Sequence, residues 1–189
     1  MEEGDRDFRL LYRNISLTVK RCSVPVIVKE VGFGLSRETA QRLAETGVAW
    51  LDVGGAGGTN FLAIEGKRHP QGIGKVFLDW GINTAASLLE VRSAGLPYKV
   101  VASGGIRNGL DIAKALALGA NMAGMAGVIL EALIKGSYKQ LLSKLDCCQQ
   151  ELTAAMMLCN AANIEQLNTV PLVVRGGTRE WCLQRGIAL

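Results

Sequence analysis

The sequence has few of the residues from which metal sites and disulfide frameworks are built. It contains one histidine and five cysteines, and no two cysteines stand in a CxxC pattern. A histidine-dependent catalytic triad and a histidine-rich metal site are therefore excluded. The odd number of cysteines favours reduced thiols in a cytoplasmic protein over disulfides or structural zinc. We accordingly expect no metal ligands among these residues.

Long hydrophobic runs and concentrated charge are also lacking. The longest uncharged stretch, between Lys114 and Glu131, contains Asn121 and three glycines, so it falls short of the ~20 apolar residues of a membrane-spanning helix. The opening MEEGDRDF is acidic and unlike a signal peptide. The net charge of +4 forms no basic patch with interleaved aromatic residues, and we therefore expect neither a membrane nor a nucleic acid as a partner.

Glycine, by contrast, is abundant: 23 of 189 residues are glycine, about 12% against an ordinary ~7%. Such an excess indicates tight turns or backbone that approaches a ligand closely. The hydrophobic content of 49% is sufficient for a folded core, and no linker rich in proline, serine or charge divides the chain. We therefore predict a single domain over residues 1–189.

Apolar strands and amphipathic helices alternate along the chain. A run such as VPVIVKEV is typical of a buried parallel strand, and each such run precedes a segment with helical spacing. Ser36 is a suitable N-cap for the first of these helices, and Gly47 is a suitable stop. The pattern predicts strands at 24–31, 48–53, 98–103 and 121–126, and helices at 36–47, 83–94, 110–119 and 127–136.

Further elements are predicted towards the C-terminus. A helix over 137–161 carries one apolar face, and the segment PLVVRGGTREWCLQRG after it predicts a short strand and a last helix. The apolar face consists of Leu141, Leu145, Cys148, Leu152 and Met156. The polar, glycine-rich segment GKRHPQGIGK, at 66–75, is predicted to be a mobile loop.

Four strands that alternate with helices imply a parallel sheet, which is either an open doubly wound sheet or part of a (β/α)8 barrel. Three strands end in glycine-rich loops, at 54–60, 104–106 and 124–127, whose backbone N–H groups are suited to an anion. Neither GGAGGT nor GGIRNG has the G-x-G-x-x-G spacing of a Rossmann fold. The loops fit the phosphate site that barrels form after strands seven and eight, which favours the barrel. Glycines that only make tight turns are the alternative.

Few side chains stand out for their chemistry. Lys29 ends an apolar strand, where an unpaired ammonium is costly to bury, and we expect it to meet an anion or an electron-rich ring at the barrel mouth; a surface lysine is the alternative. Asp52 either belongs to the same site or bonds local backbone. Glu65 either acts as an acid or cation ligand or is solvated. His69, in the predicted loop, has no catalytic partner nearby in the sequence.

Several of these motifs together resemble one family. VPVIVKEVGFGLS, LDVGGAGGTNFLAIE, DWGINTAASL, VASGGIRNGLDIAKALALGA and GMAG are similar to segments of the type 2 isopentenyl-diphosphate isomerases, which are FMN-dependent enzymes of isoprenoid synthesis. The opening EGDRDF and the tail PLVVRGGTREWCLQRG are similar as well. The resemblance implies a flavin-binding (β/α)8 barrel of which this chain is the C-terminal half, with about four βα units and the C-terminal helices.

The resemblance also implies which residues bind FMN. Lys29 would contact the flavin, and Thr59 would bind the cofactor. The residues implied to hold the FMN phosphate are Gly104, Gly105, Ile106, Ala126 and Gly127. No side chain is implied as the catalytic group, because reduced FMN itself is expected to serve as acid and base.

The implied activity converts isopentenyl diphosphate to dimethylallyl diphosphate, with NADPH as the reductant of the flavin and Mg²⁺ on the substrate diphosphate. In the family, an Arg-Lys pair and a Gln-Glu pair that bind substrate and magnesium stand upstream of the EGDR segment. Neither has an equivalent here, and Glu2 and Glu3 stand in a different context. We therefore expect this chain to be incomplete for catalysis, and to form a homo-oligomer or pair with a missing N-terminal half.

Two alternatives remain open. The first is a flavin-barrel oxidoreductase acting on a hydroxy acid, which usually brings a catalytic histidine from this half of the barrel. The second is a catalytically inert half-barrel that binds phosphate or flavin. A half-barrel exposes unpaired strand edges, which favour self-association.

Overall fold

A computed structural model describes residues 7–68 and 73–189, and within them the strands form one four-stranded parallel sheet. The strands are β1 (Ile27–Lys29), β2 (Trp50–Asp52), β3 (Lys99–Ser103) and β4 (Met122–Gly124). The helices are α1 (Leu11–Arg21), α2 (Arg37–Ala44), α3 (Phe61–Arg68), α4 (Thr84–Ser93), α5 (Gly109–Ala117), α6 (Gly127–Lys135), α7 (Tyr138–Leu158), α8 (Ile164–Leu167) and α9 (Gly176–Gln184), with a 3-10 helix η1 (Ile73–Phe77).

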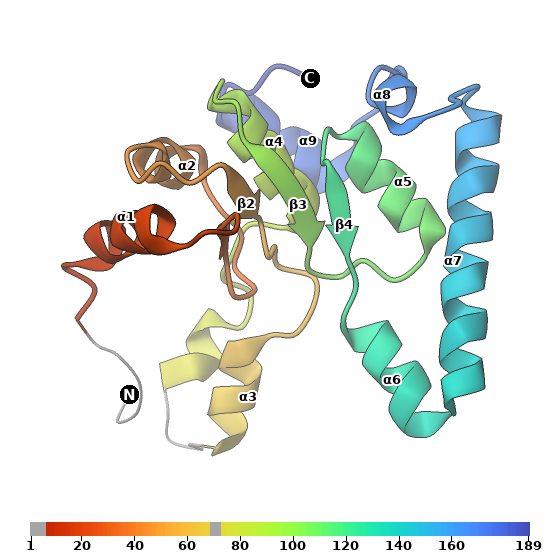
Figure 1. The fold of residues 1–189 in the computed structure, drawn as a ribbon, viewed down its shortest axis with the longest axis horizontal. Helices are drawn as coiled ribbons and strands as arrows, with labels where there is room; N and C mark the ends of the chain where they lie inside the picture. The colour runs from red at the N-terminus through yellow and green to blue at the C-terminus, as the bar shows by residue number, and fades with distance from the viewer. Residues whose placement is uncertain (1–6, 69–72) are drawn as a thin grey trace.

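The strands lie side by side in their chain order, β1-β2-β3-β4, and each pair of neighbours is parallel (Figure 1). A doubly wound sheet reverses its strand order at a switch point, whereas a (β/α)8 barrel keeps the chain order throughout. The doubly wound alternative is therefore wrong. The prediction of four βα units of a barrel, followed by C-terminal helices, is confirmed.

The hydrophobic core lies on one face of this sheet. Leu51 and Val100 are partners in the register of β2 and β3, so their side chains point to the same face, where they pack with Val91 of α4 and are at most 1% exposed. On the other face, the described residues leave Ile27 and Met122 about half exposed. One face of the sheet is packed by helices and the other is open, as in a barrel of which half the strands are present.

Two of the helices, α2 and α4, begin where the sequence predicts, and each has a side-chain N-cap. Ser36 accepts a hydrogen bond from the backbone N–H of Thr39, and Asn83 accepts one from that of Ala86. Gly47 follows α2 with a φ of +80°, a conformation that favours glycine. The strands are shorter than predicted because their outer residues lead into the loops.

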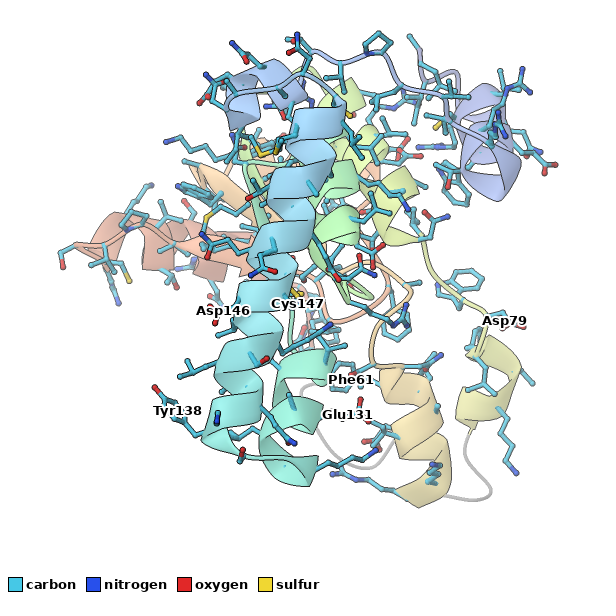
Figure 2. All side chains as sticks on the ribbon, turned by 90° about the vertical axis from the view of Figure 1, so that its right-hand side faces the viewer. Phe61, Asp79, Glu131, Tyr138, Asp146 and Cys147 are labelled. Carbon is cyan, nitrogen blue, oxygen red and sulfur yellow. The ribbon has the colours of Figure 1, made fainter. Side chains whose placement is uncertain are left out.

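Helix α7 forms a second layer by packing along α5, and Figure 2 shows it facing the viewer with Tyr138 towards its lower end. The predicted long helix is confirmed, with Ser137 as its N-cap. Of its predicted apolar face, Cys148 is buried and Leu152 packs against α5, whereas Leu145 is 42% exposed. The reason is length: α5 has nine residues and α7 has 21, so α5 covers only part of α7.

Helix α9 is tied to the other helices by a buried carboxylate. Glu90 of α4 is fully buried, and its Oε1 accepts hydrogen bonds from Trp181 Nε1 and Arg185 Nε, each 2.7 Å long. The backbone N–H of Arg37 donates to Glu90 at 3.0 Å, and Arg185 also binds the exposed Glu38. Burial would raise the pKa of the Glu90 carboxyl, but the hydrogen bonds it accepts, the one from Arg185 foremost, outweigh burial and lower that pKa.

These carboxylates predict a loss of stability in acid. The hydrogen bond from Arg185 lowers the pKa of Glu38 from 4.5 to about 2, and the pKa of Glu90 shifts in the same direction. A carboxyl group with a lowered folded-state pKa stabilises the fold above its unfolded pKa, and that stabilisation is lost as the pH falls through the folded value. We therefore expect the urea midpoint of unfolding to fall from pH 4.5 towards about 2. In an Arg185→Met variant, the urea midpoint should depend less steeply on pH. If the midpoint of the variant and that of the unchanged chain depend equally on pH, these carboxylates are not the cause of the acid sensitivity.

The segment predicted as a mobile loop at 66–75 is helical where it is described. Residues 66–68 belong to α3 and residues 73–75 to η1, while 69–72 lie outside the described residues. Asn60 begins α3 by accepting a hydrogen bond from the backbone N–H of Ala63 at 2.9 Å. Lys67 and Arg68 stand in its last turn, where cations favour the helix dipole. The loop prediction is therefore wrong for these parts of the segment.

The strand predicted from PLVV, at 171–174, is not formed in the described structure. The segment joins α8 to α9, at the upper side of the molecule in Figure 1, and Val173 is 78% exposed. A strand needs a neighbouring edge for its hydrogen bonds, and none of the four described strands pairs with this segment. The last helix of the prediction is confirmed as α9.

Candidate functional site

The residues predicted for the site gather at one edge of the sheet. The strands are parallel, so their carboxyl ends all lie on the same side, at the lower edge of the sheet in Figure 1. Lys29 ends β1, and Thr59 lies in the loop after β2. Residues 104–106 follow β3, Ala126 lies between β4 and α6, and Gly127 is the first residue of α6. Four loops or strand ends therefore contribute to one region, although each comes from a different part of the chain.

The glycine loops after β2 and β3 contact each other directly. Gly104 and Gly105 have φ angles of +100° and +82°. A Cβ on Gly104 would overlap the carbonyl oxygen of Gly55, and one on Gly105 would lie 2.5 Å from that of Gly57. The packing of the two loops alone therefore requires these glycines. To this extent the tight-turn alternative is correct.

A row of backbone N–H groups at this edge has no hydrogen-bond partner among the described residues. The row consists of the N–H groups of Gly104, Gly105 and Ile106 after β3, and of Gly127 at the start of α6. The N-cap of α6 is Ala126, whose methyl side chain cannot accept a hydrogen bond and so leaves the helix without a side-chain cap. The two segments leave the sheet side by side, because the last residues of β3 and β4 are partners. Free N–H groups and a helix N-terminus both favour an anion such as phosphate.

Lys29 is held by groups from other strand ends. Its Nζ donates to the carbonyl oxygen of Glu30 at 2.8 Å and to Ser103 Oγ at 3.4 Å, and lies 3.8 Å from Asp52 Oδ2. Ser103 Oγ donates in turn to Asp52 Oδ1 at 2.6 Å. The Lys29 side chain is still 54% exposed, so these contacts do not enclose it. Asp52 bonds local backbone, as one interpretation of the sequence expects, because it also accepts the backbone N–H of Gly54 at 3.0 Å, and its place in a functional site stays a prediction.

Thr59 lines a cavity of about 340 Å³ between the loop after β2 and the segment after η1. The lining residues are Gly32, Ala56, Gly57, Gly58, Thr59, Asn60, Leu78, Asp79 and Trp80. Asn60 joins the two walls by donating from Nδ2 to the carbonyl oxygen of Leu78 at 2.7 Å. Figure 2 shows Asp79 just beyond η1. The walls of this cavity include neither Lys29 nor the loops after β3 and β4.

Three polar side chains that hold these loops were not predicted from the sequence. Thr84 Oγ1 donates to the carbonyl oxygen of Gly104 at 2.5 Å. Arg107 donates to the carbonyl oxygens of Gly57 and Gly105, at 3.0 and 3.3 Å, and so bridges the two glycine loops. Ser103 binds Asp52 as described above. The signal for Ser103 and Arg107 is only their place beside the GGI motif, and Thr84 has no local signal at all.

The other candidate residues contribute less to the site. Glu65 forms an exposed ion pair with Arg68 at 3.1 Å, and His69 lies outside the described residues. All five cysteines are free. Within residues 7–68 and 73–189, no three or more histidine, cysteine or acidic side chains are grouped so as to hold a metal ion. In the same part of the chain, no helix has both the length and the apolar character that crossing a membrane requires.

Comparison with known proteins decides the family. A model of the FMN-dependent dehydrogenase family matches residues 5–173. The chain belongs to the FMN-dependent dehydrogenase family. The FMN-dependent class that the resemblance of the motifs implies is thereby confirmed.

The curated relatives narrow the similarity further. Isopentenyl-diphosphate delta-isomerase of Geobacillus sp. (strain WCH70) is 49% identical over 98% of this chain and 53% of its own length. The protein of the same name from Listeria innocua is 46% identical over 100% of this chain and 53% of its own length. The resemblance seen in the motifs is therefore confirmed. The chain spans about half the length of the curated relatives it matches.

Solved structures show the same fold at low sequence identity. A lactate oxidase of Pediococcus acidilactici matches with a TM-score of 0.65 and 23% identity, over 87% of this chain and 41% of that one. A mandelate oxidase matches with a TM-score of 0.64 and 19% identity, over 87% of this chain and 46% of that one. These likenesses concern the fold alone. They agree with a parallel sheet whose strands lie side by side in their chain order.

Proposed function

We propose that this chain is the C-terminal half of an FMN-dependent isopentenyl-diphosphate isomerase and that it binds the FMN phosphate. The decisive observation is the row of N–H groups without described partners at residues 104–106 and at Gly127, beyond two neighbouring strands. Barrels of this kind bind phosphate in the loops after their last two strands, which β3 and β4 would be. A Cβ on Gly127 would meet nothing within 4 Å, so this chain leaves space in front of α6 for an anion.

Each proposed binding residue has a distinct task. The backbone of Gly104, Gly105 and Ile106 would bind the phosphate together with Ala126 and Gly127 at the start of α6. Lys29 would direct its ammonium to the flavin ring, and Thr59 would bind the cofactor from the wall of its cavity. When bound, reduced FMN would supply an electron-rich ring that stabilises positive charge developing on the substrate.

Other parts of the proposal depend on groups beyond the described residues. Mg²⁺ would bind the substrate diphosphate through the half of the relatives that this chain does not span, and NADPH would reduce the flavin. The partner would be that other half, or further copies of the chain.

A cytoplasmic location is supported by the five free cysteines. A hydroxy-acid oxidoreductase usually brings a catalytic histidine from this half of the barrel, and the one histidine of the sequence, His69, lies outside the described residues.

A direct test combines this chain with the complementary half of the Geobacillus relative. We expect the pair to bind FMN and quench its fluorescence. With the flavin reduced and isopentenyl diphosphate supplied in D₂O, mass spectrometry should detect deuterium in dimethylallyl diphosphate, because the double bond moves by protonation and deprotonation. The complementary half alone is the control and should do neither. Bound, reduced FMN without deuterium incorporation would contradict the isomerase, and the absence of FMN binding would contradict the cofactor site.

A further inference from the structure

Three strand ends meet at one carboxylate beside the proposed flavin site. Asp52 ends β2, and its Oδ1 accepts a hydrogen bond from Ser103 Oγ at the end of β3. Its Oδ2 lies 3.8 Å from the ammonium of Lys29 at the end of β1. The Asp52 side chain is only 11% exposed, whereas that of Lys29 is 54% exposed. The Asp52 side chain is therefore the enclosed member of the pair, and the Lys29 side chain is the open one.

The hydrogen bonds run in one direction from the ammonium to the carboxylate. The single hydroxyl proton of Ser103 points to Asp52, so Ser103 Oγ is left to accept an N–H of Lys29 at 3.4 Å. The Glu30 carbonyl oxygen accepts a second N–H of Lys29 at 2.8 Å. An ammonium has three N–H donors, so the third is available to a ligand on the open side.

The close approach of β1 and β2 makes this arrangement possible. Gly54 has a φ of +43°, and a Cβ there would overlap the carbonyl oxygen of Glu30 and lie 3.0 Å from Lys29 Nζ. Its backbone N–H also donates to Asp52 Oδ1 at 3.0 Å. Glycine at this position therefore leaves room for the ammonium and supplies one donor to the carboxylate.

We propose that Asp52, oriented by Ser103, is a positioning residue that holds the Lys29 ammonium at the mouth of the barrel. The inference rests on the proposed function, because the group that Lys29 meets there is the flavin. Lysine is a flexible side chain with several rotatable bonds, and ordering it before the ligand arrives removes part of the entropic cost of binding. Asp52 itself touches no ligand in this role.

The test is a double-mutant cycle on FMN affinity in the chain paired with the complementary half. Lys29→Met should weaken FMN binding about tenfold, in line with the loss of one charge-assisted hydrogen bond to the ligand. Asp52→Asn should weaken it to a similar extent, because Lys29 is then no longer held in place. The Lys29→Met/Asp52→Asn variant should bind no more weakly than Lys29→Met, because Asp52 acts only through Lys29. If the double variant instead binds FMN about a hundredfold more weakly, the product of the two single losses, the two residues act independently and the inference is overturned. If Asp52→Asn does not fold, Ser103→Ala replaces it in the same cycle.

A second measurement needs no FMN. Acetic anhydride labels exposed amines, and the labelling of Lys29 is compared with that of exposed Lys20 by mass spectrometry. Asp52→Asn should raise the labelling of Lys29 several-fold. The matched control is Glu131→Gln, which removes the carboxylate 2.7 Å from Lys135 and should leave Lys29 unchanged. Unchanged labelling in Asp52→Asn would overturn the inference. Raised labelling in a chain that binds no FMN would retain it and reject the proposed function.

Discussion

Replacing Arg185 by methionine should lower the free energy of unfolding by about 3 kcal/mol, the cost of leaving a buried charge without its partner. Glu90 is fully buried, and Arg185 binds both of its carboxylate oxygens, at 2.7 and 3.2 Å. Without Arg185, the Glu90 carboxylate still accepts hydrogen bonds from Trp181 Nε1 and from the backbone N–H of Arg37, but it no longer has a cationic partner. Helix α9 should then detach from α4 more readily, because this ion pair joins them.

The measurement is urea unfolding followed by circular dichroism. The matched control is Glu38→Gln, which removes the exposed partner of Arg185 and should cost less than about 1 kcal/mol, as exposed ion pairs do. Adding Glu90→Met to Arg185→Met should recover part of the loss, because no unpaired charge is then buried. An Arg185→Met variant no less stable than the control would show that the Glu90 carboxylate does not need this cation.

Replacing Gly104 by alanine should destabilise the fold by about 3 kcal/mol, from backbone strain and overpacking together. The φ of +100° at this position is one that an L-amino acid rarely adopts. The added methyl group would also overlap the carbonyl oxygen of Gly55, which is backbone and cannot rotate away. Thr84 binds the carbonyl oxygen of Gly104, so a shift of this loop would strain that hydrogen bond as well.

Thermal and urea unfolding would measure this loss. The matched control is Gly177→Ala in α9, where the new methyl group meets nothing within 4 Å and the φ is ordinary. That change should be neutral, or stabilise the helix by up to about 1 kcal/mol. Equal stability of the two variants would mean that the loops after β2 and β3 are not packed as described.

The helices and strands of the barrel units could be predicted because their signals are local. An N-cap such as Ser36 bonds a residue three positions away, and a helix periodicity is visible within one segment. The predictions at 66–75 and 171–174 were wrong for opposite reasons. In the first, glycines and charges concealed the helix that Asn60 begins. In the second, an apolar run had no strand edge to join.

The candidate site was predictable in its backbone and less so in its side chains. Glycine loops at strand ends predict an anion site without knowledge of their neighbours, because parallel strands bring all their carboxyl ends to one edge. The sequence could not show that Gly104 and Gly105 are also required by the loop after β2. It also could not show that Thr59 lines a cavity together with the segment after η1.

By itself, the sequence determined the order of strands and helices, the caps and the glycine loops, because each depends on residues close together in the chain. Only the tertiary structure decided which distant groups meet. Asp52 and Ser103 are 51 positions apart, and Glu90 and Arg185 are 95 apart. Such pairs follow from strand register and helix packing, which bring groups into hydrogen-bond range without leaving a local pattern. The abundance of glycine, first a sign of tight turns or ligand contact, proves in the loops after β2 and β3 to be a requirement of packing.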